Sequence, residues 1–189
     1  MPLNSALLII DMQNDFVVNK NSPVYIPNSD KIILPLINAR KLFLSNKQTV
    51  IHIITEHSQN RKFWGKKDIE LNREYCMENT GGAEIIDELS KLTETELIVK
   101  KKFYSGFFET GLKEILEKKK IQNLFFTGLT TGCCVSSTAR DAYNLGYNLF
   151  FIKECMTSSS EEAHNNELIF FQKSLGSVVS INLKTALEF

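Results

Sequence analysis

The sequence has no excess charge of either sign, no long apolar run and none of the glycine-rich motifs that bind phosphate. Lys and Arg together number 22, and Asp and Glu also number 22, so the formal net charge is zero. A protein that coats nucleic acid or an anionic membrane normally carries a basic surplus. We therefore expect a small-molecule partner, and we expect binding neither to nucleic acid nor to a membrane.

Membrane-spanning and secretion signals are absent as well. No apolar run approaches the roughly 20 residues that a spanning helix needs. The first run, Ala6 to Ile10, ends at Asp11 and is too short for the core of a signal peptide, and residues 1–4 contain no Lys or Arg. The four cysteines form no Cys-x-x-Cys pair, which disfavours a redox protein. Without a secretion signal, they indicate free thiols in a reducing compartment, so we expect a cytoplasmic protein.

Several common motifs of α/β proteins are missing. Neither Gly-x-Gly-x-x-Gly nor Gly-x-x-x-x-Gly-Lys-Ser/Thr occurs, which disfavours a nucleotide-binding domain. Gly-x-Ser-x-Gly is also absent, which disfavours a serine hydrolase of the α/β type. We find no internal repeat and no linker rich in Pro, Gly or Ser. The 189 residues therefore predict one domain over residues 1–189.

Short apolar segments alternate with segments of helical spacing. The expected strands are residues 6–10, 49–54, 96–99, 123–129, 148–153 and 177–181. Most of them are continuously apolar, as is typical of a parallel sheet buried on both faces. The expected helices lie within residues 32–43, 83–89, 112–116, 135–145 and 161–175. This alternation predicts an α/β fold, a three-layer doubly wound sandwich with a six-stranded, mostly parallel sheet and helices on both faces.

One long interval, residues 56–82, lacks this periodicity. It contains Trp64 and four basic residues between positions 61 and 67. A long irregular segment inside a compact domain is usually functional or disordered, and aromatic residues favour packing over disorder. We expect it to be a lid or a contact between subunits.

A carboxylate, an amine and a thiol follow three of the expected strands. Asp11 follows the first strand, Lys101 the third, and Cys133 and Cys134 follow the fourth at the start of a helix. Because the carboxyl ends of parallel strands share one edge, these groups can meet in one crevice. There a lysine and a helix N-terminus favour a thiolate, and a carboxylate can take the proton. Taken singly, each residue has a more common role: Asp11 as a helix cap, Lys101 as solvated surface, and Cys133 or Cys134 as core packing.

Three motifs resemble the isochorismatase-like cysteine hydrolases. They are the segments Ala6–Phe16 (ALLIIDMQNDF), Lys101–Thr110 (KKFYSGFFET) and Gly128–Val135 (GLTTGCCV), the last continuing through Ala142. The resemblance extends over nearly the whole chain and implies a catalytic triad of Asp11, Lys101 and Cys134. Within that family the cysteine directly precedes a valine and the lysine stands three residues before a tyrosine. These positions select Cys134 over Cys133, and Lys101 over its two lysine neighbours.

The resemblance also implies the surroundings of the triad. It implies a cis peptide bond between Leu129 and Thr130, which would direct the Thr130 N–H, beside that of Cys134, toward one oxyanion. It further implies substrate contacts from aromatic side chains and one threonine: Phe16, Trp64, Tyr104, Phe107 and Thr131.

The chemistry that the resemblance implies is hydrolysis of a small amide, ureido or N-carbamoyl compound. A catalytic cysteine favours attack on an acyl carbon, through a thioester and with release of ammonia or an amine, over cleavage of a vinyl ether. Metal-binding nicotinamidases carry the pattern Asp-x-His followed by a further histidine. In this sequence, the stretch after the second strand has only His57. We therefore expect no metal and no other cofactor, and nicotinamidase activity is disfavoured. The alternatives are a nicotinamidase-like hydrolase of a cyclic amide and a non-catalytic interaction protein. Relatives commonly form dimers or tetramers, so we expect a homodimer or homotetramer.

Overall fold

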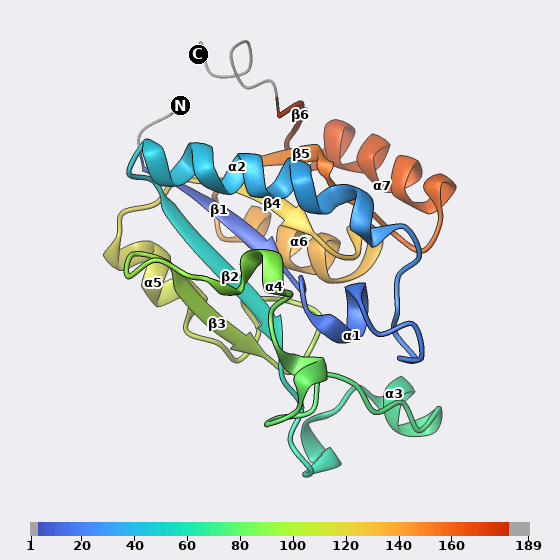
Figure 1. Cartoon of the computed structure of the whole chain (residues 1–189). Helices are drawn as coiled ribbons and strands as arrows, with labels where there is room; N and C mark the ends of the chain where they lie inside the picture. Colours follow the sequence, from blue (N-terminus) through green and yellow to red (C-terminus); the bar gives the residue numbers. More distant parts are fainter. Residues whose placement is uncertain (1–3, 182–189) are drawn as a thin grey trace.

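The computed structural model describes residues 4–181, and a parallel sheet forms the centre of this part of the chain (Figure 1). Its six strands are β1 (Ser5–Ile10), β2 (Thr49–Thr55), β3 (Leu97–Lys101), β4 (Asn123–Gly128), β5 (Asn148–Met156) and β6 (Ser177–Val179). Their order across the sheet is β3-β2-β1-β4-β5-β6, and each neighbouring pair is parallel. The predicted sheet is confirmed.

Burial explains why the central strands are continuously apolar. Every residue of β1 and β4 is buried, because both faces of the sheet are covered by other elements. On one face Phe125 packs edge-on against Phe43, at 5.1 Å between ring centroids. On the other face Phe151 stacks on Phe171 at 4.0 Å. The molecule thus has two hydrophobic cores, one on each side of the sheet.

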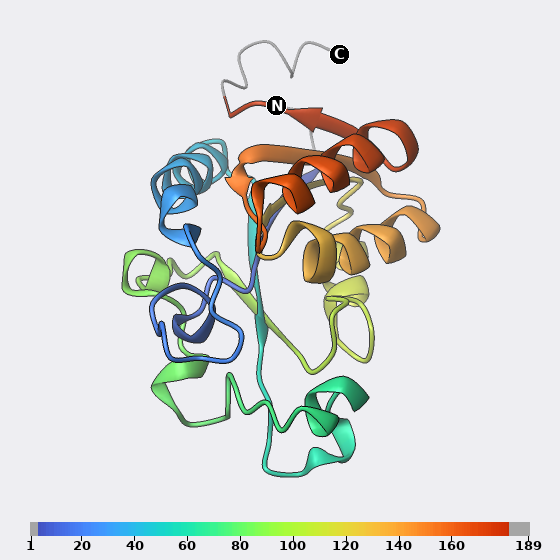
Figure 2. The same cartoon turned by 90° about the vertical axis from the view of Figure 1, so that its right-hand side faces the viewer.

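The helices divide between these two faces (Figure 2). The helices on the first face are α2 (Ile33–Ser45) and the short α4 (Asp87–Ser90), and those on the second are α5 (Leu112–Lys118), α6 (Ser136–Asn144) and α7 (Glu161–Ser174). The chain changes face after β3, which makes the fold a doubly wound three-layer sandwich, as predicted. Within residues 4–181, no helix combines the length and the apolar character needed to cross a membrane.

The strand order reverses between β1 and β4, and Gly128 allows these strands to meet there. Gly128 has a φ of +99°, and a Cβ atom at this position would lie 2.0 Å from the carbonyl oxygen of Ile10. Only glycine accepts both the backbone conformation and this close approach. The carboxyl ends of β1 and β4 therefore lie together where an open sheet binds its ligands.

Several boundaries differ from those predicted. Residues 83–89 do not form one helix: they contain the end of a 3₁₀ turn (Gly81–Ala83), an isolated antiparallel bridge from Ile85 to Gln13, and α4. The pairing of Ile85 with Gln13 takes this backbone out of the helical conformation. The strand β3 extends to Lys101, so this lysine is its last residue rather than the one after it. Residues 56–82 contain a 3₁₀ turn (Arg61–Phe63) and α3 (Lys66–Glu70).

We predict that Gly128→Ala destabilises the protein by about 3 kcal/mol or more, because a side chain there adds backbone strain to a steric clash. Gly111→Ala is the matched control, since a Cβ atom at Gly111 meets nothing within 4 Å and its φ is negative. Urea denaturation of both variants measures the difference. Equal stability of the two variants would contradict the argument.

Candidate active site

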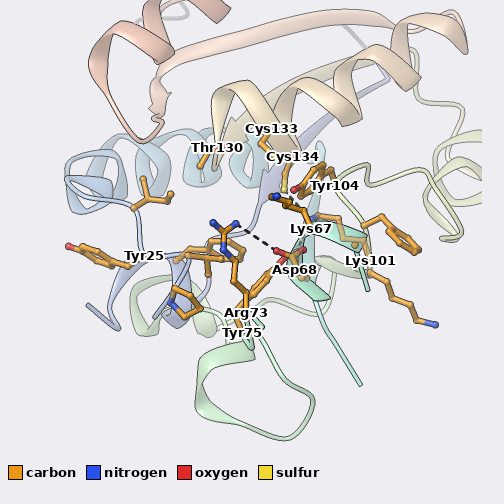
Figure 3. Close-up of a pocket in the computed structure, with 18 of the residues that line it drawn as sticks. Tyr25, Lys67, Asp68, Arg73, Tyr75, Lys101, Tyr104, Thr130, Cys133 and Cys134 are labelled. Atoms are coloured by element: carbon orange, nitrogen blue, oxygen red, sulfur yellow. Dashed lines mark hydrogen bonds and ion pairs between the residues drawn. The ribbon is translucent and has the colours of Figure 1, made fainter. Parts of the chain in front are cut away.

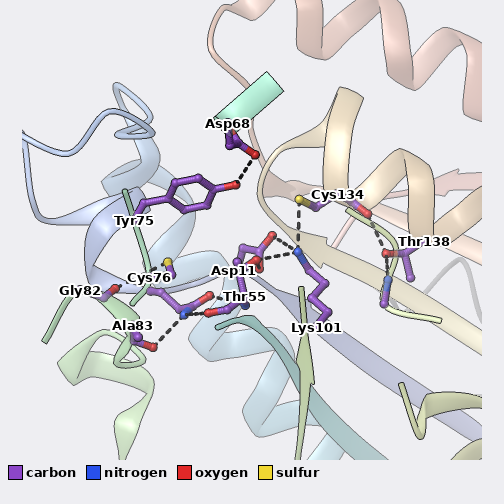
Figure 4. A network of polar contacts seen from close by, with 12 residues as sticks. Asp11, Thr55, Asp68, Tyr75, Cys76, Gly82, Ala83, Lys101, Cys134 and Thr138 are labelled. Carbon is purple, nitrogen blue, oxygen red and sulfur yellow. Dashed lines mark hydrogen bonds and ion pairs between the residues drawn. The ribbon is translucent and has the colours of Figure 1, made fainter. Parts of the chain in front are cut away.

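The fold brings Asp11, Lys101 and Cys134 together at the reversal of strand order (Figure 4). The Nζ atom of Lys101 lies 3.0 Å from Oδ2 of Asp11 and 3.4 Å from Sγ of Cys134. All three side chains are buried, and Lys101 is only 2% exposed. The ammonium group therefore lies between a carboxylate and a thiol, in a region largely closed to water.

Each of the three residues is held by a distinct local structure. Asp11 follows β1 with a φ of +53°, a conformation that aspartate tolerates better than most residues, and its N–H donates to Ile53. Cys134 lies in a π-helical turn (Thr131–Val135) that leads into α6, and such turns are frequent at functional sites. The hydroxyl of Thr138 donates to the Cys134 carbonyl and accepts from the N–H of Gly106, which ties this turn to the segment after β3.

Thr55 and Gln13 complete the network, and the sequence reasoning missed both. The Thr55 hydroxyl donates to Oδ1 of Asp11 at 2.9 Å and accepts from Lys101 at 2.7 Å. Gln13 accepts from the N–H of Thr55 and donates to two carbonyls, those of Thr55 and Ala83. The one available signal was that Thr55 ends a strand adjacent to β1. Together these contacts fix the carboxylate and the ammonium in one orientation.

The charges of the site are interdependent. Burial lowers the pKa of Lys101, but the Asp11 carboxylate and the Cys134 sulfur outweigh it and raise this pKa above its ordinary value. A hydrogen bond with Cys133, burial and the Asp11 carboxylate raise the pKa of the Cys134 thiol, and only Lys101 opposes them. Lys101 thus favours the thiolate, as expected, but in the free protein its effect on the Cys134 pKa is outweighed by Cys133, burial and Asp11. The raised pKa favours the protonated thiol, with the Asp11 carboxylate near enough to influence it.

A cavity of about 500 Å³ opens above these residues (Figure 3). Lys101 and Cys134 lie in its wall, together with the predicted contact residues Phe16 and Tyr104. Tyr104 is 49% exposed and reaches toward the opening, whereas Phe16 is buried. The size fits a small organic substrate.

Three predicted contact residues lie outside the cavity lining. Trp64 is buried against His57 and donates from its indole N–H to the carbonyl of Ser58. Phe107 stacks with Tyr147 at 6.0 Å between ring centroids. Thr131 contacts the carbonyl of Thr157 and the ring of His164. Phe107 and Trp64 therefore contribute to packing, and Thr131 holds the π-helical turn against the segment after β5.

The predicted cis peptide bond between Leu129 and Thr130 is wrong. Residues 4–181 contain no cis peptide bond. No proline follows Leu129 to lower the cost of the cis form, about 3–4 kcal/mol for other residues. The chain turns instead through the positive φ of Gly128 and a hydrogen bond from the Thr131 N–H to Thr157. The expectation that Thr130 supplies an oxyanion donor rested on the cis bond and loses its basis.

The residues near His57 do not form a metal site. Both nitrogens of the buried His57 ring lack hydrogen-bond partners among residues 4–181, but the ring lies against Trp64 and Tyr75, at 5.1 and 4.8 Å between centroids. In the described part of the chain, no three His, Cys, Asp or Glu side chains lie close enough to share a metal ion. A single imidazole between aromatic rings does not supply the three or more ligands that a catalytic metal needs.

The irregular segment supplies one wall of the cavity, and its residues were missed as site residues. Asp68, Arg73 and Tyr75 line the cavity from this segment, and Tyr25 lines it from the loop before α2. The Tyr75 hydroxyl donates to Asp68 at 3.2 Å. Apart from its aromatic residues and its basic charges, the segment carried no motif from which these positions could be predicted.

Comparisons with known proteins agree with this architecture. Residues 5–182 match the isochorismatase domain family. The chain is 34% identical to a nicotinamidase of Schizosaccharomyces pombe, over 95% of this chain and 94% of the relative. It is 29% identical to the ureidoacrylate amidohydrolase RutB of Acinetobacter baylyi, over 77% of this chain and 67% of the relative. An isochorismatase-like hydrolase from Alkaliphilus metalliredigens has a similar structure, with a TM-score of 0.82 and 30% identity over 95% and 96% of the two chains.

The chain therefore belongs to the isochorismatase family, as its three motifs predicted, and it is an enzyme of this family.

We predict that His57 makes the protein less stable in mild acid. Burial lowers the pKa of His57 below its ordinary value near 6.5, against the carboxylates of Asp68 and Asp11, while Lys101 lowers it further. The unfolded chain then binds more protons than the folded one, so stability is full above pH 6.5 and falls as the pH drops below it.

Urea denaturation at pH 7 and pH 5 tests this dependence. The stability of His57→Phe should decrease less between the two pH values than that of the wild type. Both proteins contain the same other groups that titrate in this range, so the contributions of those groups to the change in stability cancel when both proteins unfold in one transition. Equal decreases would show that His57 does not contribute.

Proposed function

We propose that this enzyme is a cysteine-dependent amidohydrolase. It would cleave a C–N bond of a small amide, ureido or N-carbamoyl compound, with Cys134 as nucleophile, Asp11 as base and Lys101 as the cation between them. The single observation that supports this most strongly is the position of the Lys101 ammonium, within 3.4 Å of both the Asp11 carboxylate and the Cys134 sulfur. Isolated core packing does not require a buried charge in contact with a thiol.

In the first half of the reaction, Asp11 takes the proton of the Cys134 thiol as the substrate carbonyl arrives. The sulfur attacks the carbonyl carbon, and the C–S bond forms as the electron pair of the double bond moves onto oxygen. The backbone N–H of Cys134 is the proposed donor to this oxyanion. The C–N bond then breaks, and the leaving ammonia or amine takes the proton from Asp11, which leaves a thioester.

In the second half, Asp11 takes a proton from water, and the resulting hydroxide attacks the thioester. The C–S bond breaks, the acid product leaves, and the proton returns from Asp11 to the Cys134 sulfur. Throughout, Lys101 keeps its charge and its hydrogen bond to Thr55, so it balances whichever of the two partners is negative. The raised pKa of Lys101 supports this constant charge.

We predict that Cys134→Ala abolishes ammonia release. Wild type and variant are assayed on nicotinamide, N-carbamoyl amino acids, ureidoacrylate-like compounds and biuret. Cys155→Ala is the matched control, because this cysteine is buried outside the cavity lining. Turnover of some substrate by the wild type and the control, but not by Cys134→Ala, is the expected result. Absence of wild-type turnover on all of these compounds would favour a non-catalytic protein.

We predict that Asp11→Asn lowers kcat by about 100- to 10,000-fold, the usual contribution of a general base. The asparagine amide keeps the shape of the side chain but cannot take the proton. It also leaves Lys101 without its anion, and breaking a buried pair costs about 3–5 kcal/mol. Circular dichroism and denaturation must therefore accompany the kinetics. Unchanged kcat in a folded variant would refute the role of Asp11.

A nicotinamidase-like activity on a cyclic amide is the second candidate. The full-length similarity to the fission yeast nicotinamidase supports it. Among residues 4–181, no group of three His, Cys, Asp or Glu side chains could hold a metal ion, which fits a nicotinamidase that uses Asp11, Lys101 and Cys134 better than one that depends on a metal. Turnover of nicotinamide by the wild type, compared with turnover of the ureido and N-carbamoyl compounds, decides between the two candidates.

The predicted homodimer or homotetramer and the cytoplasmic location stay predictions. Light scattering after gel filtration measures the oligomeric state directly. The four cysteines are all free thiols in the structure, which is compatible with a reducing compartment.

A further inference from the structure

The walls of the cavity are strongly basic although the whole chain is electrically balanced. Five cationic side chains line the cavity, Lys66, Lys67, Arg73, Lys101 and Lys102, and Asp68 is the one acidic residue among the lining residues described in the structure. Lys101 is already neutralised by Asp11. Lys67 also pairs with Glu70, but the cations of the lining still outnumber its one carboxylate, which favours anions in the cavity.

Arg73 stands apart from the three lysines because its guanidinium is directed into the cavity (Figure 3). Its side chain is 41% exposed, and its guanidinium, unlike its backbone N–H, donates none of the hydrogen bonds found within residues 4–181. Its single ionic neighbour there is Asp68, at 3.9 Å, too far for a hydrogen bond. Asp68 instead accepts from the Tyr75 hydroxyl. The fork of donors on Arg73 is thus open to a ligand.

The lysines have other contacts and contribute mainly through their charge. Lys67 donates to Glu70 at 3.1 Å, and Lys102 lies over the ring of Phe63 at 4.1 Å. A guanidinium binds a carboxylate through two parallel hydrogen bonds, whereas an ammonium acts as a point charge. Arg73 is therefore the residue whose geometry selects an acid group.

Apolar and aromatic side chains occupy the remaining wall, including Phe16, Val24, Ile26 and Tyr104. They suit a short carbon spacer between two polar ends. One end is the carbonyl that Cys134 attacks, and the other is the group that Arg73 binds.

We propose that Arg73 is a specificity residue that binds the carboxylate of an acidic substrate, so that the enzyme acts on N-carbamoyl or ureido acids in preference to neutral amides. This inference rests on the proposed function, and it selects one substrate class within it. A cyclic neutral amide has no group for Arg73 to bind.

Alkylation of Cys134 tests the anion site without any turnover. Iodoacetate and iodoacetamide deliver the same type of group to a thiol, but only iodoacetate is charged. Rates at Cys134 are followed by tandem mass spectrometry, whose fragment ions distinguish alkylation of this residue from that of the adjacent Cys133. Arg73→Gln should lower the iodoacetate rate by about three- to tenfold, the effect of one charge near a half-buried anion, and leave the iodoacetamide rate within about twofold.

Arg61→Gln is the matched control for this experiment. Arg61 belongs to the same irregular segment and is also 41% exposed, but it pairs with Glu74 and lies outside the cavity lining. Its replacement removes the same charge and should leave both alkylation rates unchanged. An equal effect of the two substitutions, or none from Arg73→Gln, would overturn the proposal.

Turnover of a matched pair of ureas provides the second test. The pair is 3-ureidopropionate and propylurea, which share the scissile group. The first has a carboxylate where the second has a methyl group. The wild type should prefer 3-ureidopropionate in kcat/KM, and Arg73→Gln should reduce this preference by about tenfold or more, the value of a charged hydrogen bond. The loss should fall mainly on KM, because Arg73 does not contact the reacting atoms.

The two proposals fail in different ways. Cys134-dependent turnover without preference for the acid, in the wild type and in Arg73→Gln alike, would refute the acidic substrate and leave the amidohydrolase intact. Absence of any Cys134-dependent turnover would refute the amidohydrolase, and the ratio of the two alkylation rates would still decide whether Arg73 forms an anion site.

Discussion

The buried ion pair between Asp11 and Lys101 is the interaction on which the site depends. A charge taken out of water costs several kcal/mol unless it is paired and hydrogen-bonded, so neither side chain can occupy this position alone. The Thr55 hydroxyl forms hydrogen bonds with both partners of the pair. The Lys101 ammonium also contacts the sulfur of Cys134. Through this contact, the energetics of folding and the protonation of Cys134 depend on the same few atoms.

The three groups meet because of where the sheet changes direction. Asp11 follows β1, Lys101 ends β3 and Cys134 follows β4, and the reversal of strand order brings these carboxyl ends to one edge. Gly128 makes this possible, since no side chain fits between β4 and the carbonyl of Ile10. The same backbone turn then places Cys134 at the start of α6. Strand order and one glycine therefore fix the geometry of the nucleophile.

The irregular segment has a second role, which is to shape the cavity above the triad. Trp64 and Tyr75 pack against His57 within the segment, and Tyr75 also packs against Phe16 in the body of the protein. This packing leaves Asp68 and Arg73 on the inner side, where they line the cavity. The three sequence motifs contain the proposed catalytic residues, whereas this segment carries none of them and forms part of the cavity wall.

The sequence by itself determined the strands and the helices on both faces, and its motifs singled out Asp11, Lys101 and Cys134, because continuous apolar runs and short motifs are local signals. It failed at residues 83–89, where pairing of Ile85 with Gln13 overrides helical spacing, and it did not show that Trp64 and Phe107 lie outside the cavity lining. Only the tertiary structure decided the roles of Thr55 and Arg73 and the raised pKa of Cys134. Each of these depends on burial and on distances between segments far apart in the chain, and neither quantity is encoded in a short stretch of residues.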